Sequence, residues 1–420
     1  MAVVHPPELQ RRTMRVLVLS QVLGGVGVGS GVAVVALLAY QLSGTEALSG
    51  VSATASTIGA AAAALFIARI AASRGRRPGL VAGYAVGAIG AGLAVLAAVM
   101  GSFPLHVVSS LAFGWASAAN LHARFAATDL AEPERRAGSL SIVVWATTVG
   151  AVLGPNLTGP GEAVAGALGL PPLAGSYLFS LAAFTAAAVV QQVWLRPDPL
   201  LISRGTPEEP VTPSSTTIRS ALRVVRAQPA AAAALSSIAA AHATMVGVMV
   251  MTPVHMEHHG ATLQLVGLTI SLHIAGMYAF SPVVGWLADR FGRRTTLLLG
   301  LGQLAVAVTM AAFGAADGSV PFAAGLVMLG TGWSFCLVAG STLLTEVVPV
   351  EERPTVQGAS DLVMNLAGGA GGIAAGIVLA VAGYRSLALG ALLLLIVPLW
   401  RVARLPGTAA DSPLVPTGQR

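Results

Sequence analysis

Residues 280–305 read FSPVVGWLADRFGRRTTLLLGLGQLA, two apolar runs that are separated by one short charged segment. That segment contains Asp289, Arg290, Arg293 and Arg294. A run of about 20 predominantly apolar residues is long enough to cross the hydrocarbon core of a bilayer as an α-helix. The stretch therefore predicts two membrane-spanning helices that are joined by a short, arginine-rich loop.

The same alternation extends along the whole chain of 420 residues, of which 55% are apolar and only 10% are charged. A soluble globular domain has roughly 25% charged residues, so the composition excludes that class. The 49 glycines suit close helix packing in lipid. We therefore expect an all-α membrane protein with twelve spans. The predicted spans are 16–40, 48–70, 79–100, 103–127, 138–158, 172–195, 230–254, 262–288, 296–316, 320–345, 358–383 and 385–404.

The basic residues predict the orientation of these spans. All 23 are arginine, and a composition rich in alanine, glycine and valine without lysine is typical of a GC-rich bacterial genome. With the N-terminus in the cytoplasm, 22 arginines lie on the cytoplasmic side and only Arg385 lies outside. This asymmetry follows the positive-inside rule. It predicts a multi-pass protein of the bacterial inner (plasma) membrane with both termini in the cytoplasm.

Two halves of the chain carry related positions at a constant offset. The matched pairs are Gly114–Trp115 with Gly332–Trp333, Arg135 with Arg353, Gly150 with Gly368, and Gly154 with Gly372, each 218 residues apart. Internal repeats of this kind are typical of secondary transporters. The repeat predicts two six-helix bundles related by a pseudo-two-fold axis, residues 1–195 and 230–405, with a cytoplasmic linker at 196–229 and a cytoplasmic tail at 406–420.

The linker has two parts. Residues 207–216, PEEPVTPSST, are polar and rich in proline. Beyond them Arg219, Arg223 and Arg226 recur at helical spacing with apolar residues between them. This spacing suits a short helix on the cytoplasmic membrane surface, with its arginines toward anionic lipid. A solvated linker is the alternative, and the sequence does not separate the two.

Residues 285–294, GWLADRFGRR, resemble the G-x-L-a-D-R-x-G-R-R loop of the major facilitator superfamily. The resemblance implies a cytoplasmic loop that latches the two halves in the outward-open state. Because a helix N-terminus attracts an anion, Asp289 is expected at the start of a helix from the opposite half. Arg293 is expected to pair with Glu346 at the end of helix ten. The implied gate residues are Gly285, Asp289, Arg290, Gly292, Arg293, Arg294 and Glu346.

The first-half copy of this loop, residues 68–77 (ARIAASRGRR), departs from the family pattern. Ala68 stands where the family has its first glycine, and Ala72 stands where it has aspartate. The departure argues against a symmetric latch. Arg76 with Asp129 is the expected counterpart of the Arg293 pair, and these two residues complete the predicted cytoplasmic gate.

Residues 150–159, GAVLGPNLTG, are similar to the G-x-x-x-G-P-x-x-G motif of the superfamily's antiporters. Gly150 and Gly154 lie four residues apart, which leaves a smooth face for close approach of another helix. Pro155 is expected to bend the helix. This resemblance favours an antiporter that exports its substrate.

Polar and aromatic side chains near the middle of the spans are candidate contacts for cargo, because polar groups are expensive at that depth. They are Trp115, His242, His273 and Trp333. In the superfamily helices one, four, seven and ten line the central cavity, which implies that Trp115, His242 and Trp333 face it. The alternatives are core or lipid packing for the tryptophans and a structural hydrogen bond for the histidines. No acidic residue lies near a span midpoint, so a histidine is the expected proton carrier.

Residues 255–259, HMEHH, carry side chains that suit zinc or copper. Their order is not H-E-x-x-H, so we interpret them as a polar outer loop and predict no metal site. Cys336 is the only cysteine, which excludes a disulfide framework and a metal cluster held by cysteines alone. No cofactor and no catalytic residue are predicted.

The sequence thus predicts a secondary active transporter of a small, partly apolar molecule that works by alternating access, with export as the preferred direction. The expected partners are that substrate, membrane lipid, and protons as a candidate coupling ion, and the expected state is a monomer. Nucleic acid is excluded because the arginines are not gathered on one domain. Nutrient uptake is the main alternative. A membrane metalloenzyme and a non-transporting receptor are alternatives from other classes.

The topology is testable with a single thiol. We replace Ser214 in the linker with cysteine after changing Cys336→Ala. Because the linker is predicted to be cytoplasmic, an impermeant maleimide should label this cysteine in inverted vesicles and leave it unlabelled in intact cells. The Cys336→Ala parent controls for background, and labelling of Ser214→Cys in intact cells would overturn the topology.

Overall fold

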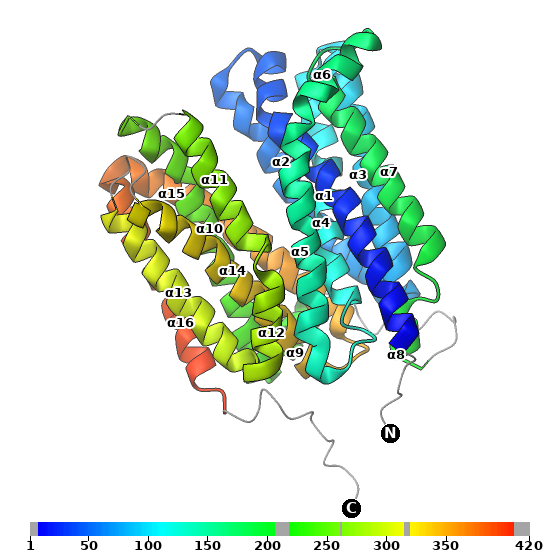
Figure 1. The fold of residues 1–420 in the computed structure, drawn as a ribbon, viewed down its shortest axis with the longest axis vertical. Coiled ribbons are helices and arrows are strands. Elements are labelled where there is room, and N and C mark those ends of the chain that lie inside the picture. Colours follow the sequence, from blue (N-terminus) through cyan, green and yellow to red (C-terminus); the bar gives the residue numbers. More distant parts are fainter. Residues whose placement is uncertain (1–6, 206–217, 261–262, 315–319, 407–420) are drawn as a thin grey trace, which may run out of the picture. The chain divides into compact units, whose positions relative to one another are not determined.

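The structure, a computed structural model, describes residues 7–205, 218–260, 263–314 and 320–406 (Figure 1). Within these ranges the chain forms helices joined by short turns and contains no strand. The prediction of an all-α protein is therefore confirmed.

The helices follow the predicted order along the chain. The first half contains α1 (Pro7–Ser43), α2 (Glu46–Arg74), α3 (Arg76–Met100), α4 (Phe103–Ala126), η1 (Pro133–Arg135), α5 (Arg136–Asn156), α6 (Thr158–Ala167), α7 (Ala174–Trp194) and α8 (Pro199–Ser203). The second half contains α9 (Ile218–Ala227), α10 (Pro229–His258), α11 (Leu263–Tyr278), α12 (Ser281–Phe291), α13 (Arg293–Phe313), α14 (Val320–Val347), α15 (Arg353–Gly390) and α16 (Leu392–Ala403).

Among the described residues, ten helical stretches are long and apolar enough to cross a bilayer. α4 is not one of them, since it carries two histidines, an asparagine and an arginine in its 24 residues. The last stretch, Arg353–Ala403, holds two predicted spans, which separate at Gly383, where φ is 76°. With α4 included and this stretch divided, the helices correspond to the twelve predicted segments.

Prolines explain two differences from the predicted spans. The span expected at 262–288 is divided into α11 and α12, and Pro282 stands at the start of α12. Proline has no N–H to donate and its ring clashes with the preceding turn, so a continuous helix is disfavoured there. Pro155 lies in the last turn of α5, which ends at Asn156 before α6 begins.

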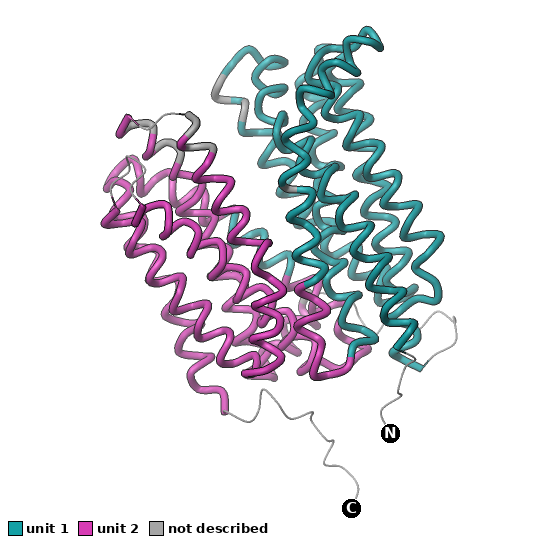
Figure 2. The backbone as a smooth tube through the Cα atoms, viewed as in Figure 1, with its two compact units in different colours: residues 1–131, 142–216, 361–369 teal, residues 132–141, 217–360, 370–420 magenta. Residues whose placement is uncertain are grey.

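The chain divides into two compact units, which Figure 2 shows in different colours. Unit 1 comprises residues 1–131, 142–216 and 361–369, and unit 2 comprises residues 132–141, 217–360 and 370–420. Each unit thus includes a short segment of a helix whose remainder belongs to the other unit. The start of α5 belongs to unit 2, and a stretch of α15 belongs to unit 1.

Each unit has its own packing centre. In unit 1, α4 packs against α2 and α3, and α7 packs against α1 and α3. Phe113 of α4 makes edge-to-face contacts with Tyr177 and Phe184 of α7, with ring centroids 6.0 and 5.1 Å apart. In unit 2, α14 packs against α10, α11 and α13, and α16 packs against α10 and α13.

Glycines allow α1 and α5 to touch backbone to backbone in unit 1. A Cβ atom added at Gly150 would overlap the backbone of Gly25, and one added at Gly154 would lie 2.6 Å from the Cα of Gly29. No side chain fits at either position without moving the helices apart. The smooth face predicted from the four-residue spacing therefore exists, and its partner is α1.

The two arginine-rich loops have the same backbone conformation. Gly75, between α2 and α3, has φ 92° and ψ 175°, and Gly292, between α12 and α13, has φ 85° and ψ 155°. Residues other than glycine rarely adopt this region. The conformation explains why glycine stands at both repeat-related positions.

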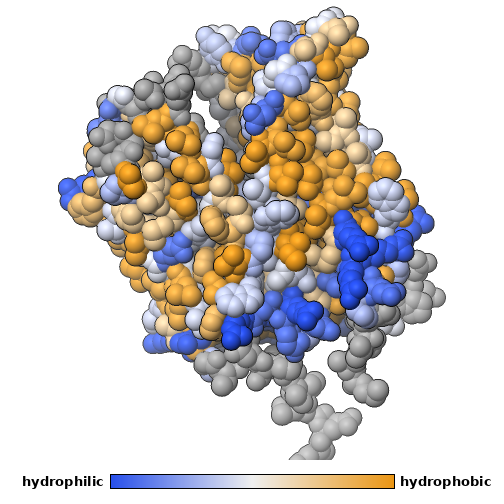
Figure 3. Space-filling model, viewed as in Figure 1, coloured by the Kyte–Doolittle hydropathy of each residue, from blue (hydrophilic) through white to orange (hydrophobic). Residues whose placement is uncertain are grey.

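Large apolar side chains are exposed along the flanks of the helices in each unit, which is the pattern expected of a surface that faces lipid. Figure 3 shows such residues over the helices of unit 1, with hydrophilic residues gathered near the start of α1. Examples that are more than half exposed are Ile58, Ile89 and Val189 in unit 1 and Ile373, Ile377, Leu393 and Trp400 in unit 2.

The second part of the linker is a helix, α9, as one of the two interpretations predicted. Arg219, Arg223 and Arg226 are exposed, whereas Ala221 and Val225 on the opposite face are buried. The amphipathic arrangement is therefore present, and contact with lipid stays a prediction. The proline-rich stretch 207–216 lies outside the described residues.

The close contact between α1 and α5 leads to a stability prediction. Gly150→Ala places a methyl group on the Gly25 backbone, and overpacking of this kind costs about 1–3 kcal/mol. We expect the variant to unfold at a lower temperature than the parent in detergent. Gly159→Ala is the matched control, because a Cβ at Gly159 meets nothing within 4 Å. Equal thermal stability of the two variants would contradict the contact.

Candidate functional site

The carboxylate of Asp289, near the end of α12, accepts two hydrogen bonds from the start of α5. Its Oδ1 lies 3.1 Å from the backbone nitrogen of Ala137, and its Oδ2 lies 2.7 Å from that of Gly138. The first N–H groups of a helix have no partner within the helix and carry the positive end of its dipole. The Asp289 carboxylate supplies an anion there and accepts from two of these N–H groups. This geometry agrees with the predicted placement of Asp289, and its role as a latch stays a prediction.

Arg293, the first residue of α13, holds this carboxylate and a second one. Its Nη2 lies 2.7 Å from Oε1 of Glu346 and 3.2 Å from Oδ1 of Asp289. The same guanidinium donates to the backbone oxygens of Ala288 and Pro133, at 2.7 and 2.9 Å. Because the arginine is only 6% exposed, these contacts are partly shielded from water. Both the predicted Glu346 pair and the Asp289 contact are therefore made by one side chain.

Gly285 of α12 lies directly against α5. A Cβ at this position would overlap the side chain of Ser141, so only glycine fits. Ser281, one turn earlier, donates a hydrogen bond to the Ser141 backbone oxygen at 3.1 Å. The first glycine of the loop pattern thus allows α12 to approach the start of α5.

Among the residues that the structure describes, the other two arginines of the loop contact no carboxylate. Arg294 donates to the backbone oxygens of Val402 and Ala403, at 3.2 and 3.0 Å, and so satisfies carbonyl groups at the end of α16. Arg290 is exposed, and its guanidinium lies over the ring of Trp286 at 6.0 Å. The contacts of Arg294 fit a structural role, and the contact of Arg290 fits a role at the protein surface.

In unit 1 Arg76 and Asp129 form a bidentate pair. Nε of the arginine lies 2.8 Å from Oδ2 of Asp129, and Nη2 lies 3.0 Å from Oδ1. Both side chains are almost fully buried. The predicted counterpart of the Arg293 pair is therefore present, despite the missing aspartate at Ala72.

Asp198, which no motif indicated, occupies the N-terminus of α3. Its two carboxylate oxygens accept from the backbone nitrogens of Arg76 and Arg77, at 3.1 and 2.7 Å. The same residue caps α8, where it accepts from Leu200 at 3.0 Å. An aspartate before Pro199 is a recognisable N-cap signal. That signal reveals the contact with α8 but not the one with α3, which is 122 residues away.

A buried charged cluster in unit 1 was missed by the sequence analysis. Arg124 of α4 pairs with Asp361 of α15, and His122 Nε2 lies 3.5 Å from the Asp361 carboxylate. All three side chains are at most 2% exposed. Arg124 was counted with the topogenic arginines, and Asp361 was counted among acids near helix ends. Their burial could not be inferred from either position.

His242 and Trp333 contact each other in unit 2. The indole Nε1–H of Trp333 donates to Nδ1 of His242 at 2.9 Å, and Tyr278 places its ring edge-on to Trp333 at 5.7 Å. Indole can only donate a hydrogen bond. The neutral His242 ring must therefore carry its hydrogen on Nε2. A proton arriving at Nδ1 would break the bond to Trp333.

Trp333 itself differs from the expectation that it faces a cavity. Its side chain is 2% exposed and its indole N–H is already used by His242. His242 is half-buried. The rotation of α14 turns the tryptophan into the core of unit 2.

Trp115 and His273 fit the packing alternatives. Trp115 stacks on Phe66 at 5.5 Å, with an interplanar angle of 27°, and lies against the core of unit 1. His273 is 2% exposed, and its Nδ1 lies 2.7 Å from the Leu326 backbone oxygen. Their predicted contact with cargo has no support in these surroundings.

The stretch 255–259 is not the outer loop that we predicted. α10 extends to His258, so His255 stands in the last turn of a helix. Its ring stacks on Tyr384 at 4.1 Å. The side chains of Glu257 and His258 lie outside the described residues.

Comparisons with known proteins agree with this architecture. Among curated proteins, the chain is 38% identical over 404 residues to the uncharacterized MFS-type transporter YddS of Bacillus subtilis, covering 95% of this chain and 92% of that protein. It is 28% identical over 360 residues to the riboflavin transporter RfnT of Brucella anthropi, covering 84% and 85% of the two chains.

A solved structure shares the fold. The proton:xylose symporter XylE superposes with a TM-score of 0.73 at 15% identity, covering 97% of this chain and 98% of the symporter. The family model described as Major Facilitator Superfamily matches residues 17–255 and 234–418. The chain therefore belongs to the major facilitator superfamily, as the arginine-rich loop predicted.

Proposed function

We propose that this protein is a secondary active transporter that exports a small, partly apolar molecule by alternating access. Family membership supports transport in general. The observation that carries the proposal is the contact of Asp289 with the start of α5, because it is a set of bonds that a moving helix can make and break. Two backbone N–H groups and one arginine hold the carboxylate, and all of these contacts are non-covalent.

The strength of this contact suits a gate. An anion at a helix N-terminus contributes about 0.3–1 kcal/mol at an exposed site and up to about 2 kcal/mol where it is partly buried. A contact of this size biases a conformational equilibrium several-fold without making it irreversible. In the proposed cycle, release of Asp289 leaves the carboxylate and the two N–H groups to be hydrated.

His242 is the proposed coupling residue. Its Nδ1 is held by a donor, so a proton from the aqueous side can bind there only if the Trp333 bond breaks. Proton binding would therefore be linked to a rearrangement of α10 against α14, both of which belong to unit 2. Linkage of this kind is what coupling to a proton gradient requires.

The substrate class and the direction rest on separate arguments. No acidic residue was found near a span midpoint, which favours a partly apolar cargo. The direction rests on the similarity of residues 150–159 to the antiporter motif. Uptake is the second candidate, and the likeness to a riboflavin transporter makes riboflavin a compound to test.

The function is tested in inverted membrane vesicles from cells with and without the protein, over a compound panel that includes riboflavin. We expect vesicles with the protein to accumulate at least one compound when a proton gradient is imposed. His242→Gln should retain binding and downhill exchange but lose gradient-driven accumulation, because glutamine cannot carry the proton.

His273→Gln is the control for this variant, since it changes a histidine of the same unit that hydrogen-bonds a backbone oxygen. Full accumulation by His242→Gln would refute its coupling role. If no compound moved in either direction at any gradient, the transport function itself would be wrong, and accumulation in whole cells instead of vesicles would indicate uptake.

The gate is tested by Asp289→Asn, which removes the charge and keeps the size of the side chain. We expect a shift of about two- to fivefold toward the inward-open population, because the attraction to the α5 dipole is lost. Spin-label distances across the cytoplasmic face measure the populations. Glu132→Gln is the matched control, as it removes an acid from the same region whose side chain is 72% exposed. Unchanged distances in Asp289→Asn would count against the gate.

A further inference from the structure

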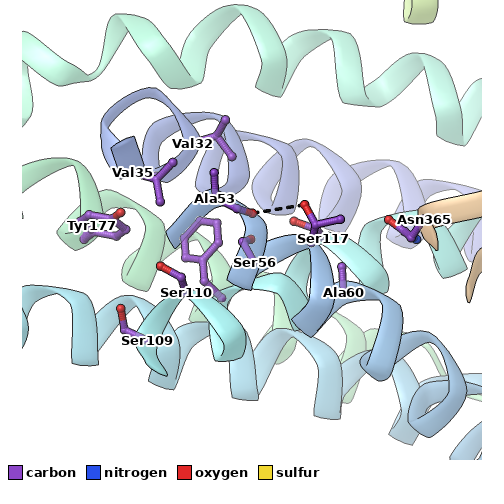
Figure 4. Close-up of a pocket in the computed structure, with 13 residues that line it drawn as sticks. Val32, Val35, Ala53, Ser56, Ala60, Ser109, Ser110, Ser117, Tyr177 and Asn365 are labelled. Atoms are coloured by element: carbon purple, nitrogen blue, oxygen red, sulfur yellow. Dashed lines mark hydrogen bonds between the residues drawn. The ribbon is translucent and has the colours of Figure 1, made fainter. Parts of the chain in front are cut away.

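Unit 1 contains a cavity of about 280 Å³ that none of the predicted site residues lines. Helices α1, α2, α4 and α7 form its wall, and Asn365 of the α15 segment that belongs to unit 1 closes one end (Figure 4). Figure 4 shows Tyr177 and Asn365 at opposite ends, with serines between them. The cavity is distinct from the Asp289 contact and from the His242 pair, both of which lie in unit 2.

The lining combines hydroxyl groups with apolar surface and carries no charged side chain. The hydroxyl groups belong to Ser56, Thr57, Ser109, Ser110, Ser117 and Tyr177. The apolar part of the lining is formed by Val32, Val35, Ala53, Ala60 and Phe113. A charged ligand would lose its hydration here without gaining a counter-charge, which is strongly unfavourable. The cavity therefore suits an uncharged molecule.

The hydroxyl group of Tyr177 is the feature that indicates a ligand. The side chain is 2% exposed, and its oxygen has no hydrogen-bond partner among the described residues. Edge-to-face contacts with His106 and Phe113, both at 6.0 Å, hold the ring in place. A buried hydroxyl without a partner is unfavourable by about 1–3 kcal/mol. A ligand that accepts a hydrogen bond would remove this penalty.

The serines offer the complementary group. Ser109 and Ser110 donate to the His106 backbone oxygen, at 2.7 and 2.8 Å. A hydroxyl that donates its hydrogen still has lone pairs that accept. The cavity thus presents one free donor at Tyr177 and acceptors along α4.

We propose that this cavity is a binding subsite for an uncharged, mainly apolar molecule that carries a hydrogen-bond acceptor for Tyr177 and a donor for the α4 serines. The subsite rests on the proposed transport function, since it names the class of substrate. Its volume is close to the lower end of the roughly 300–1,000 Å³ that ligand pockets occupy, so the bound part is small.

The test uses the purified full-length protein in detergent and the fluorescent probe 7-amino-4-methylcoumarin. The probe is uncharged at neutral pH, with a lactone carbonyl as acceptor and an amine as donor. We expect saturable binding of this probe and at least tenfold weaker binding of its 3-acetic acid derivative, which carries a carboxylate. Absence of saturable binding by the uncharged probe, or equal binding of the two, would overturn the proposal.

Two variants test whether the probe binds in the cavity. Ala53→Leu adds bulk to the lining from an exposed position of α2 and should abolish binding. Ala62→Leu adds the same bulk to an exposed position of α2 that does not line the cavity, and should bind as the parent does. Binding that survives Ala53→Leu would show that the probe sits elsewhere and would overturn the assignment.

Tyr177→Phe separates an effect on ligand binding from an effect on protein stability. Removing a hydroxyl that has no partner should leave the thermal stability of the ligand-free protein equal or higher, while probe binding weakens about three- to tenfold. Unchanged binding would refute the role of Tyr177. The binding assay needs no flux, so binding without transport would contradict only the proposed function. Transport that none of these cavity variants alters would contradict only the subsite.

Discussion

The carboxylates of Asp129, Asp289 and Asp361 each lie against a positive group on a different segment of the chain, because a charge that is withdrawn from water needs a partner within the protein. The positive group is a guanidinium for Asp129 and Asp361, whereas Asp289 lies against both the start of α5 and the Arg293 guanidinium. Removing one partner from the fully buried Asp129 or Asp361 pair costs about 3–5 kcal/mol, which is far more than a surface salt bridge contributes. The positions of α3, α5 and α15 within their units are tied to these contacts.

The remaining packing follows from small side chains. Gly25 and Gly150 meet through their backbones, and Gly285 lies against Ser141. Without a hydrophobic driving force between helices in lipid, such close contacts supply much of the attraction. In unit 2 they bring α12 near enough to α5 for the Asp289 carboxylate to reach two N–H groups. The glycines therefore position the charged contacts.

Much of the fold could be predicted because the spans and the loop arginines are local patterns, and because the repeat is visible as matched residues at one constant offset. The Arg293 contact with Glu346 was predictable for the same reason, since a ten-residue motif specified the arginine and α14 ends with one acid nearby. Arg124 and Asp361 are 237 residues apart, and each resembles an ordinary helix-end charge. Only the packing of α4 against the α15 segment buries them. The unpartnered Tyr177 hydroxyl and the inward rotation of Trp333 depend on packing in the same way.

Neither compact unit is encoded by one continuous piece of the chain, and this affects how the protein is made. Unit 1 lacks residues 361–369 until most of the second half has left the ribosome. Arg124 is inserted long before its acidic partner is synthesised, so the early intermediate holds a guanidinium that water, lipid headgroups or an insertion factor has to solvate. The buried pair of unit 1 is therefore complete only after Asp361 has been synthesised, and a chain cut within the linker yields two fragments that each lack a segment of their own unit.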